Sequence, residues 1–275
     1  KTNTSQNVAL VIPTINNSYF SEIAAGVDSV LQSKKYSLFI FQHYNKAEVE
    51  FQITRKLIEN RIAGAIFVGL PYNHDDARNF RELTKSGVAV VFANRSFEPG
   101  PYPLVISDYT GGGRQGAKHL LALGHRKIGI ISGFKDHPES DKRLHGCFKF
   151  LAENGVTVDR QNIYYSEYSH EKAAEIAINL ARQGVEAIFS VSDLMAVGAL
   201  KGLQRYGVKI PDDIALVGFG NTLHARLTTP ELTSIDLQSH TVGSKSAEVL
   251  INIINGHKVE EVHTLSTKLV RREST

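Results

Sequence analysis

The sequence predicts an α/β protein made of two doubly wound parallel-sheet lobes with a ligand cleft between them. Short apolar runs alternate with helical patterns along almost the whole chain, which is typical of a parallel sheet covered by helices. A length of 275 residues allows one large domain or two of ordinary size, and the alternation restarts near residue 127, which favours two. Two such sheets in series indicate a ligand site between their strand ends.

The first lobe is predicted from five apolar runs separated by helical patterns. The expected strands lie at residues 8–12, 37–41, 64–69, 88–92 and 104–106. The expected helices cover residues 19–32, 47–60, 76–85 and 110–123, each to within a few positions.

The second lobe begins with a strand at residues 127–131 and has further strands near Ile163, at 187–190 and at 214–217. The last two runs are too short and apolar for surface segments, so buried strands are expected there. Helices are expected over residues 139–154, 171–183 and 193–206, with Asp193 as the cap of the third. A helix at 241–255 and a strand at 265–270 end the chain.

Composition excludes several classes of protein. A hydrophobic content of 42% and a charged content of 21% are those of a globular protein, and no apolar run approaches the ~20 residues of a membrane span. A net charge of +3 spread along the chain gives no basic stripe for a phosphate backbone. The single cysteine, Cys147, cannot form an intramolecular disulfide and is expected to be a small buried filler, which favours a reducing, cytoplasmic setting. The first residues, KTNTSQN, contain no apolar signal region.

Several motifs together resemble the effector-binding core of the LacI/GalR (lactose and galactose repressor) family. They are Asp193 opening LMAVGAL, the stretches IPDDIALVGF and LGHRKI, a Pro-x-Leu-Thr-Ser turn before Ile235, Arg143-x-x-Gly146, and Ile12-Pro13 ahead of NSYF. The resemblance covers nearly the full chain and implies a periplasmic-binding-protein-like fold with three crossovers between the lobes. It implies an N-terminal lobe of residues 1–123 plus 239–262 and a C-terminal lobe of 124–238 plus 263–275. The DNA-binding head that such repressors carry before this core is absent from the sequence.

The resemblance also implies ligand contacts. In the family, aromatic residues at the positions of Tyr19, Phe20 and Tyr168 lie against the ligand, and the arginine at position 143 contacts the effector; its planar fork suits vicinal hydroxyls or a carboxylate. From the residues alone, Tyr19 or Phe20 could instead pack on the start of its own helix, and Tyr168 and Arg143 could be solvated. The expected ligand-binding residues are Tyr19, Phe20, Asn94, Asp108, His137, Arg143, Tyr168, Asp193, Gly220 and Asn221.

Two of these positions depart from the family pattern. Asn94 stands where related sugar-binding proteins commonly have an aspartate, and Gly220 stands where many members have an aspartate that accepts hydrogen bonds from the effector. Loss of that charge beside Arg143 predicts a sugar acid, a sugar phosphate or a ligand bulkier than a neutral hexose. The alternative is that Asn221 or a water replaces the acceptor and an ordinary sugar binds.

Other motifs carry less weight. The stretch GGGRQG at residues 111–116 matches a dinucleotide-binding pattern, but it lies deep in the chain and lacks the acidic ribose ligand, so close packing of a helix is the favoured interpretation. The eleven histidines show no metal-ligand spacing, and no nucleophile elbow is present. We therefore expect no catalytic residues, no metal and no cofactor.

These observations predict the effector-binding and dimerisation core of a LacI-type transcriptional regulator. Its expected partners are a small sugar, sugar acid or sugar phosphate, a second copy of the chain, and operator DNA only through the missing N-terminal helix-turn-helix. No membrane contact is expected. The alternative is a periplasmic sugar-binding protein of a transporter, which shares the two-lobe fold, and an enzyme ranks third.

Overall fold

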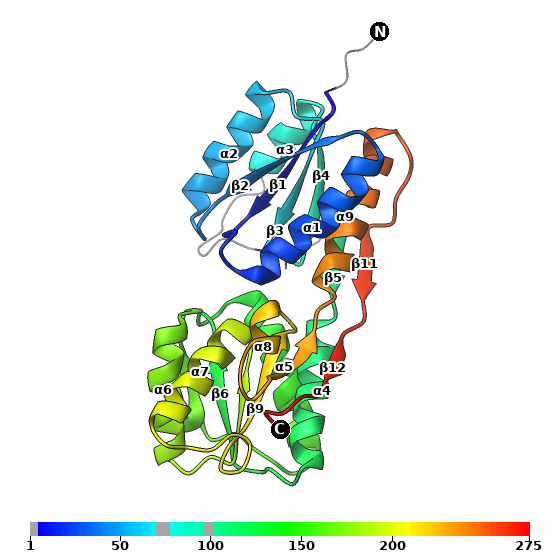
Figure 1. The fold of residues 1–275 in the computed structure, drawn as a ribbon. Coiled ribbons are helices and arrows are strands. Elements are labelled where there is room, and N and C mark those ends of the chain that lie inside the picture. The colour runs from blue at the N-terminus through cyan, green and yellow to red at the C-terminus, as the bar shows by residue number, and fades with distance from the viewer. Residues whose placement is uncertain (1–4, 70–77, 96–101) are drawn as a thin grey trace. The chain divides into compact units, whose positions relative to one another are not determined.

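The computed structural model describes residues 5–69, 78–95 and 102–275, which form two compact α/β units (Figure 1). Unit 1 contains residues 1–107 and 238–265, and unit 2 contains residues 108–237 and 266–275. The chain therefore passes from one unit to the other three times. Each unit holds a mostly parallel sheet with helices, so the predicted fold class is confirmed.

Unit 1 is built around a sheet with the strand order β11-β5-β4-β3-β1-β2, in which all described pairs are parallel. Its elements are β1 (Asn7–Ile12), α1 (Ser18–Ser33), β2 (Ser37–Gln42), α2 (Ala47–Glu59), β3 (Gly64–Val68), α3 (Arg78–Lys85), β4 (Ala89–Ala93), β5 (Leu104–Ser107), α9 (Ser239–Ile254) and β11 (Val262–Leu265).

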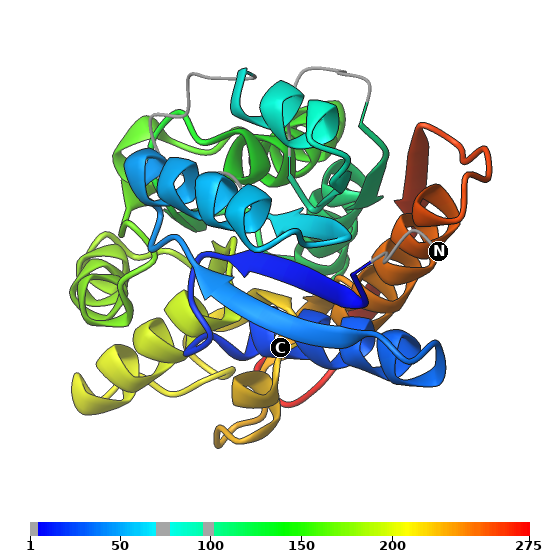
Figure 2. The ribbon, with the colours of Figure 1, turned by 90° about the horizontal axis from the view of Figure 1, so that it is seen from above.

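The two faces of this sheet carry separate cores because successive side chains of a strand point in opposite directions. From β1, Leu10 and Ile12 pack with α1 and α9, whereas Ala9 and Val11 pack with α2 and α3. Figure 2 shows α1 and α9 on one side of β1 and β2, with α2 on the other. Because helices cover both faces of the sheet, its polar loops lie at the ends of the strands.

Unit 2 repeats this plan with the strand order β12-β10-β9-β8-β6-β7, where only β10 and β12 among the described pairs run antiparallel. Its elements are α4 (Tyr109–Ala122), β6 (Ile128–Ser132), α5 (Pro138–Glu153), the 3-10 helix η1 (Arg160–Asn162), β7 (Ile163–Tyr165), α6 (His170–Arg182), β8 (Ala187–Ser190), α7 (Asp193–Arg205), β9 (Ala215–Gly220), α8 (Leu223–Arg226), β10 (Thr233–Asp236) and β12 (Lys268–Val270).

Three features differ from the sequence-based expectation. Helix α4, which the sequence assigned to the first lobe, belongs to unit 2 because it packs closely on α5. The predicted last strand, residues 265–270, is shorter and forms β12 in unit 2, while β11 in unit 1 was not predicted. The turn predicted before Ile235 continues into β10. The expected start of a further helix at residue 76 lies outside the described residues, and the described part of that helix is α3, Arg78–Lys85.

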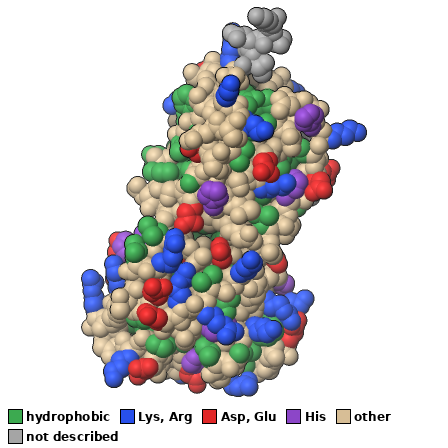
Figure 3. All heavy atoms as spheres, turned by 45° about the vertical axis from the view of Figure 1, so that its right-hand side comes forward, with side chains coloured by type: hydrophobic (Ala, Val, Ile, Leu, Met, Phe, Trp, Pro, Cys, Tyr) green, Lys and Arg blue, Asp and Glu red, His purple; other side chains and the backbone are tan. Residues whose placement is uncertain are grey.

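Acidic and basic side chains are interspersed on the face shown in Figure 3. Within the residues that the structure describes, no helix is long and apolar enough to cross a membrane.

Candidate functional site

In unit 1, the loops after β1 and β4 bring Tyr19 and Asn94 together. Asn17 caps α1 by accepting a hydrogen bond from the Tyr19 amide at 3.1 Å, which places Tyr19 and Phe20 in the first helical turn. Their rings lie 5.0 Å apart in an edge-to-face arrangement, and both are half-buried against the unit 1 core. The Asn94 Nδ2 atom donates to the Tyr19 hydroxyl at 2.6 Å. Two of the predicted ligand residues therefore share one hydrogen bond.

Asn94 is held by its own backbone and by β5. It adopts a left-handed conformation with φ 45°, which asparagine tolerates better than most residues, and its side chain is buried. Its Oδ1 accepts from the Ser107 amide at 2.7 Å, and its Nδ2 also donates to the Ser107 hydroxyl. The amide thus fixes the Tyr19 hydroxyl relative to the ends of β4 and β5.

The neighbouring Arg95 is turned into the core of unit 1. It is fully buried, pairs with both carboxylate oxygens of Glu50 at 2.6 and 3.0 Å, and lies 5.1 Å from the ring centres of Phe80 and Phe92. These contacts occupy the Arg95 guanidinium inside the core. We therefore assign Arg95 a structural role, in which it connects α2 to the end of β4.

In unit 2, Arg143 on α5 is held in a fixed plane. Its guanidinium carbon lies 4.5 Å from the ring centre of Tyr109 and 5.0 Å from that of Phe219, and one nitrogen donates to the Val191 carbonyl at 2.8 Å. The residue is only 7% exposed. Packing between two rings removes most of the rotamer freedom of the side chain, so its donors point in one direction. Val191 follows β8, which places the guanidinium at the carboxyl edge of the unit 2 sheet.

The glycines of the 111–116 stretch create this arrangement. A Cβ on Gly113 would lie 1.9 Å from the Arg143 carbonyl oxygen, and a Cβ on Gly146 would lie 1.9 Å from the Thr110 carbonyl oxygen. A Cβ on Gly112 would lie 2.7 Å from the ring of Phe219. Backbone contact between α4 and α5 therefore requires glycine at 113 and 146, and Gly112 leaves room for the Phe219 ring, as the packing interpretation of the stretch predicts.

Asp108 begins α4 as its N-cap. Its Oδ1 accepts from the Gly111 amide at 2.8 Å, and its backbone carbonyl accepts from the Thr267 hydroxyl. This predicted ligand residue thus secures the start of α4 at the passage between the units.

An aromatic cluster that contains Tyr168 and His137 follows β6 and β7. Tyr168 has φ 60° and packs against Gly133, where a Cβ would come within 2.3 Å of the ring. Its hydroxyl hydrogen-bonds the Ser140 hydroxyl at 2.8 Å. The ring centres of Phe134 and His137 lie 5.7 and 6.2 Å from that of Tyr168. The structure thus brings Tyr168 and His137 together at the carboxyl edge.

Sequence reasoning missed Phe134, Ser140 and Glu139 in this cluster. The His137 Nδ1 atom lies 2.9 Å from a Glu139 oxygen, and Glu139 is 4% exposed. Phe134 comes two residues after the end of β6, and a residue just after a parallel strand lies at the edge where such sheets bind ligands; that placement is the signal that would have identified it.

Asp193 has a different role from the predicted helix cap. The capping position of α7 is Ser192, and Asp193 is the first residue of the helix. Its Oδ2 accepts from the Thr222 amide at 2.7 Å and from the Thr222 hydroxyl at 3.0 Å, and its Oδ1 accepts from the Ser234 hydroxyl at 2.5 Å. Burial raises the pKa of the Asp193 carboxyl, while these hydrogen bonds and the charge of Arg272 oppose the shift. Both oxygens thus hold the loop after β9.

Gly220 and Asn221 form that loop, and both have left-handed backbones, with φ 135° and 50°. A Cβ at Gly220 would lie 3.2 Å from Thr222 Cγ2 and 3.3 Å from Asp193 Oδ2. The Asn221 amide donates to the Ser234 hydroxyl at 2.9 Å, and the Asn221 Oδ1 accepts from Arg272 at 2.5 Å. The structure therefore joins Asp193, Gly220 and Asn221 in one polar network, with Arg272 from the C-terminal tail.

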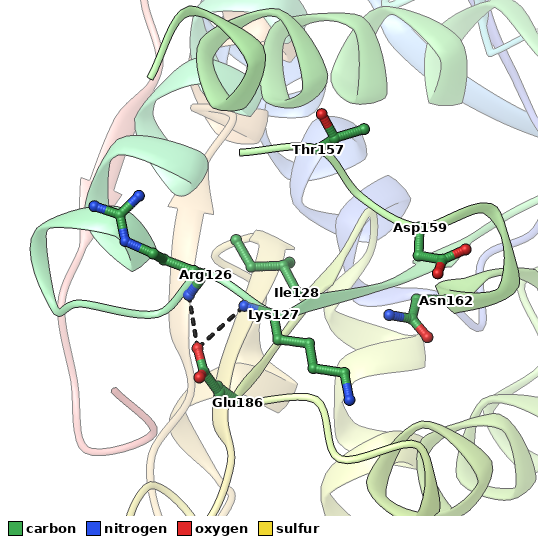
Figure 4. A pocket seen from close by; sticks show the side chains of 7 residues that line it. All are labelled: Arg126, Lys127, Ile128, Thr157, Asp159, Asn162 and Glu186. Atoms are coloured by element: carbon green, nitrogen blue, oxygen red, sulfur yellow. Dashed lines mark hydrogen bonds between the residues drawn. The ribbon is translucent and has the colours of Figure 1, made fainter. Parts of the chain in front are cut away.

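A cavity of about 310 Å³ lies at the opposite, amino-terminal edge of the unit 2 sheet (Figure 4). Arg126, Lys127 and Glu186 line it at the starts of β6 and β8, and Glu186 accepts from the backbone amides of Arg126 and Lys127 at 2.6 and 3.1 Å. The LGHRKI motif thus forms a turn closed by Glu186. None of the predicted ligand residues lines this cavity.

Metal and thiol chemistry find no support in the described residues. Among them, no group of three or more His, Cys, Asp or Glu side chains could hold a metal ion. Cys147 is fully buried, and burial raises the pKa of its thiol to about 12, so it stays protonated and unreactive at neutral pH.

Comparison with known proteins places this site in context. Residues 117–275 match the model of the periplasmic binding protein-like domain. The chain is 27% identical over 270 residues to the HTH-type transcriptional regulator DegA of Bacillus subtilis, covering 98% of this chain and 80% of DegA.

Two solved structures of transcriptional regulators are also similar to this chain in sequence and fold. The transcriptional regulator CelR–cellobiose complex superimposes with a TM-score of 0.88 at 26% identity, over 98% of this chain and 85% of that one. The regulator CcpA of Lactococcus lactis superimposes with a TM-score of 0.89 at 26% identity, over 98% and 99% of the two chains.

Proposed function

The chain belongs to the periplasmic binding protein-like domain family, in the group formed by LacI-type transcriptional regulators, and from this premise we propose that it is the effector-binding and dimerisation core of such a regulator. A small sugar or sugar-derived molecule binds it and alters DNA binding by an N-terminal helix-turn-helix. The relatives are regulators, which favours this function over that of a transporter's binding protein. A protein that acts on operator DNA works in the cytoplasm and needs no catalytic group.

The observation that carries this proposal is the preorganised Arg143. A guanidinium clamped between Tyr109 and Phe219 loses little freedom when it binds, so its hydrogen bonds to a ligand are made at low entropic cost. Tyr168 adds an aromatic face at the same carboxyl edge, and Tyr19 adds a fixed phenol in unit 1. Rings and planar donors are the groups that recognise sugars and their derivatives. The related CelR structure is a complex with cellobiose, which supports this ligand class.

The effector acts by differential binding. A ligand shifts an equilibrium between two states of a protein only if it binds one of them better, and a ligand with equal affinity for both shifts nothing. The DNA-binding segment then responds to the state that the effector favours.

Dimerisation is proposed from exposed apolar side chains. On the edge strand β2, Phe39 and Ile40 are 46% and 44% exposed, and around α8, Leu223 and Leu227 are 47% and 73% exposed. An apolar edge strand presents unpaired backbone groups as well as hydrophobic surface, so it favours association with another chain. A two-fold dimer would also match a two-fold operator.

The proposal is tested with the complete gene product and a panel of sugars, sugar acids and sugar phosphates. A compound that stabilises the protein in thermal-shift assays is expected to change its affinity for DNA from its own promoter region, measured by fluorescence anisotropy. If stabilising compounds leave DNA affinity unchanged, the effector function is wrong.

A further inference from the structure

Arg272 controls which atom of the Asn221 carboxamide is available to a ligand. An arginine has five N–H donors and no acceptor, so it can hold only the oxygen of an amide. One guanidinium nitrogen of Arg272 donates to the Asn221 Oδ1 at 2.5 Å, and another donates to the Leu232 carbonyl at 2.7 Å. The third nitrogen lies 3.4 Å from Glu231, so the guanidinium is fixed on three sides.

The side-chain oxygens that contact the loop after β9, those of Asp193 on α7 and Ser234 on β10, are already engaged. Both Asp193 oxygens accept hydrogen bonds from Thr222 and Ser234, and the Ser234 hydroxyl itself accepts from the Asn221 amide. Gly220 has no side chain to offer. Among the residues that the structure describes, the Asn221 Nδ2 has no hydrogen-bond partner, although Asn221 is half-buried. The loop is therefore rich in satisfied acceptors and retains a donor.

Net charge alone does not select a ligand at this edge, because Glu231 lies 3.4 Å from Arg272 and the buried Glu139 lies beside His137. Arg143 and Arg272 are cations, while the Asp193 carboxyl is enclosed and its burial disfavours the ionised form. At the start of α5 the exposed Lys135 and Lys142 offset the exposed Asp136 and Asp141.

We propose, granting the effector function above, that Arg272 orients Asn221 as a hydrogen-bond donor and that the unit 2 edge thereby selects an effector carrying a carboxylate or a phosphate. An anionic oxygen accepts from an amide N–H more strongly than a neutral hydroxyl does, so the fixed orientation discriminates between a sugar and its acid. Arg272 is a positioning residue in this scheme, because it acts through Asn221.

The test compares matched pairs of compounds, gluconate with glucose and ribose 5-phosphate with ribose, by calorimetry on the full chain. The wild type is expected to bind at least one anion at least about tenfold more tightly than its neutral partner, the effect of one charge-assisted hydrogen bond. Asn221→Asp keeps an acceptor for Arg272 and removes the donor, so it should abolish that preference. Arg272→Gln frees the amide to rotate and should reduce the preference, whereas Arg271→Gln, at the exposed neighbouring residue, should leave it unchanged.

A second measurement, by NMR, does not depend on which anionic and neutral compounds are compared. In ¹⁵N-labelled protein, the Asn221 side-chain amide signals, identified by their loss in Asn221→Asp, should shift when the anion binds and stay in place with Arg272→Gln. Arg272→Lys, which restores a donor, should restore the shift.

The outcomes separate the two proposals. If neutral sugars bind as well as their anions and Arg143→Ala removes that binding, the effector function stands and the selection of anions is overturned. If no compound of either class binds, both proposals fail. An unchanged anion preference in Asn221→Asp overturns the role of Asn221 and Arg272.

Discussion

The side chain of Arg143 joins recognition to stability. It packs between Tyr109 and Phe219 and is almost buried, so it belongs to the core as much as to the site. Arg143→Ala is expected to reduce affinity for the effector by about 2–5 kcal/mol, the range for a buried charge-assisted contact. It should also reduce the free energy of unfolding by about 1–3 kcal/mol. The Val191 carbonyl loses its hydrogen-bond donor, and the rings of Tyr109 and Phe219 lose the side chain packed between them.

Calorimetry with the most stabilising compound and urea denaturation would measure these two effects. Arg143→Lys is the matched control, since it keeps the charge but loses the planar fork, and it should recover part of the stability without the affinity. Unchanged affinity in Arg143→Ala would show that the effector binds elsewhere.

Asp193 shows the limit of local sequence patterns at this scale. An aspartate before an apolar helical stretch predicts an N-cap, and the helix does begin at this residue. Its hydrogen-bond partners, Thr222 and Ser234, are 29 and 41 positions away, so no local pattern could identify them. Tyr19 was different, because its place after a strand was readable from the sequence, although its bond to Asn94 was not.

The buried Asp193 carboxyl makes stability depend on pH. Its native pKa is raised above the ordinary value of 3.8, so the native state holds the proton more tightly than the unfolded chain does. This contribution to stability is fully present below pH 3.8 and is lost as the pH rises through the native pKa. Asp193→Asn removes the titration. The free energy of unfolding of the wild type relative to Asp193→Asn is therefore expected to fall as the pH rises above about 4.

Urea denaturation of both proteins between pH 4 and 8 checks this expectation. A difference that is constant across the range, or that grows with pH, would contradict a raised native pKa.

At the scale of elements, the close contact of α4 with α5 determines where Arg143 stands. Gly113→Ala would force a Cβ to within 1.9 Å of the Arg143 carbonyl oxygen, which the rigid helix backbone cannot avoid without separating the helices. We expect a loss of unfolding free energy of about 1–3 kcal/mol or more. Because α5 would move, the position of the guanidinium should change and effector affinity should fall with stability.

The exposed Lys118 on the same helix provides the control. Lys118→Ala should change stability by less than about 0.5 kcal/mol, since surface substitutions seldom have larger effects. Equal stability of Gly113→Ala and Lys118→Ala in thermal denaturation would refute the backbone contact.

The sequence predicted most elements of the fold because long amphipathic helices and buried apolar runs have clear periods. Strand β11 was missed, because two of its four positions are exposed and it does not stand out from its surroundings. The predicted last strand at residues 265–270 contains the three-residue β12. The membership of α4 in unit 2 depends on contact with α5, which is a tertiary property that helix periodicity does not contain.

At the scale of the whole molecule, association of two copies would cover the exposed apolar side chains. Association through β2 in unit 1 would bury Phe39, and association through the α8 region in unit 2 would bury Leu227; both side chains are exposed in the single chain. Phe39→Lys combined with Leu227→Lys places charges in such an interface. We expect the dimer dissociation constant to rise at least about 100-fold, since burying two unpaired charges costs several kcal/mol.

Sedimentation velocity across a concentration series would measure this change. The matched control is Val262→Lys on β11, the opposite edge strand of unit 1, where a residue that is 53% exposed also receives a charge. The wild type and the control should be dimers at tens of micromolar, and the double variant should be a folded monomer by circular dichroism. Because a monomer cannot present two DNA-binding segments to a two-fold operator, the double variant of the complete gene product should also lose operator affinity. A dimer that survives the double substitution would place the interface on another face.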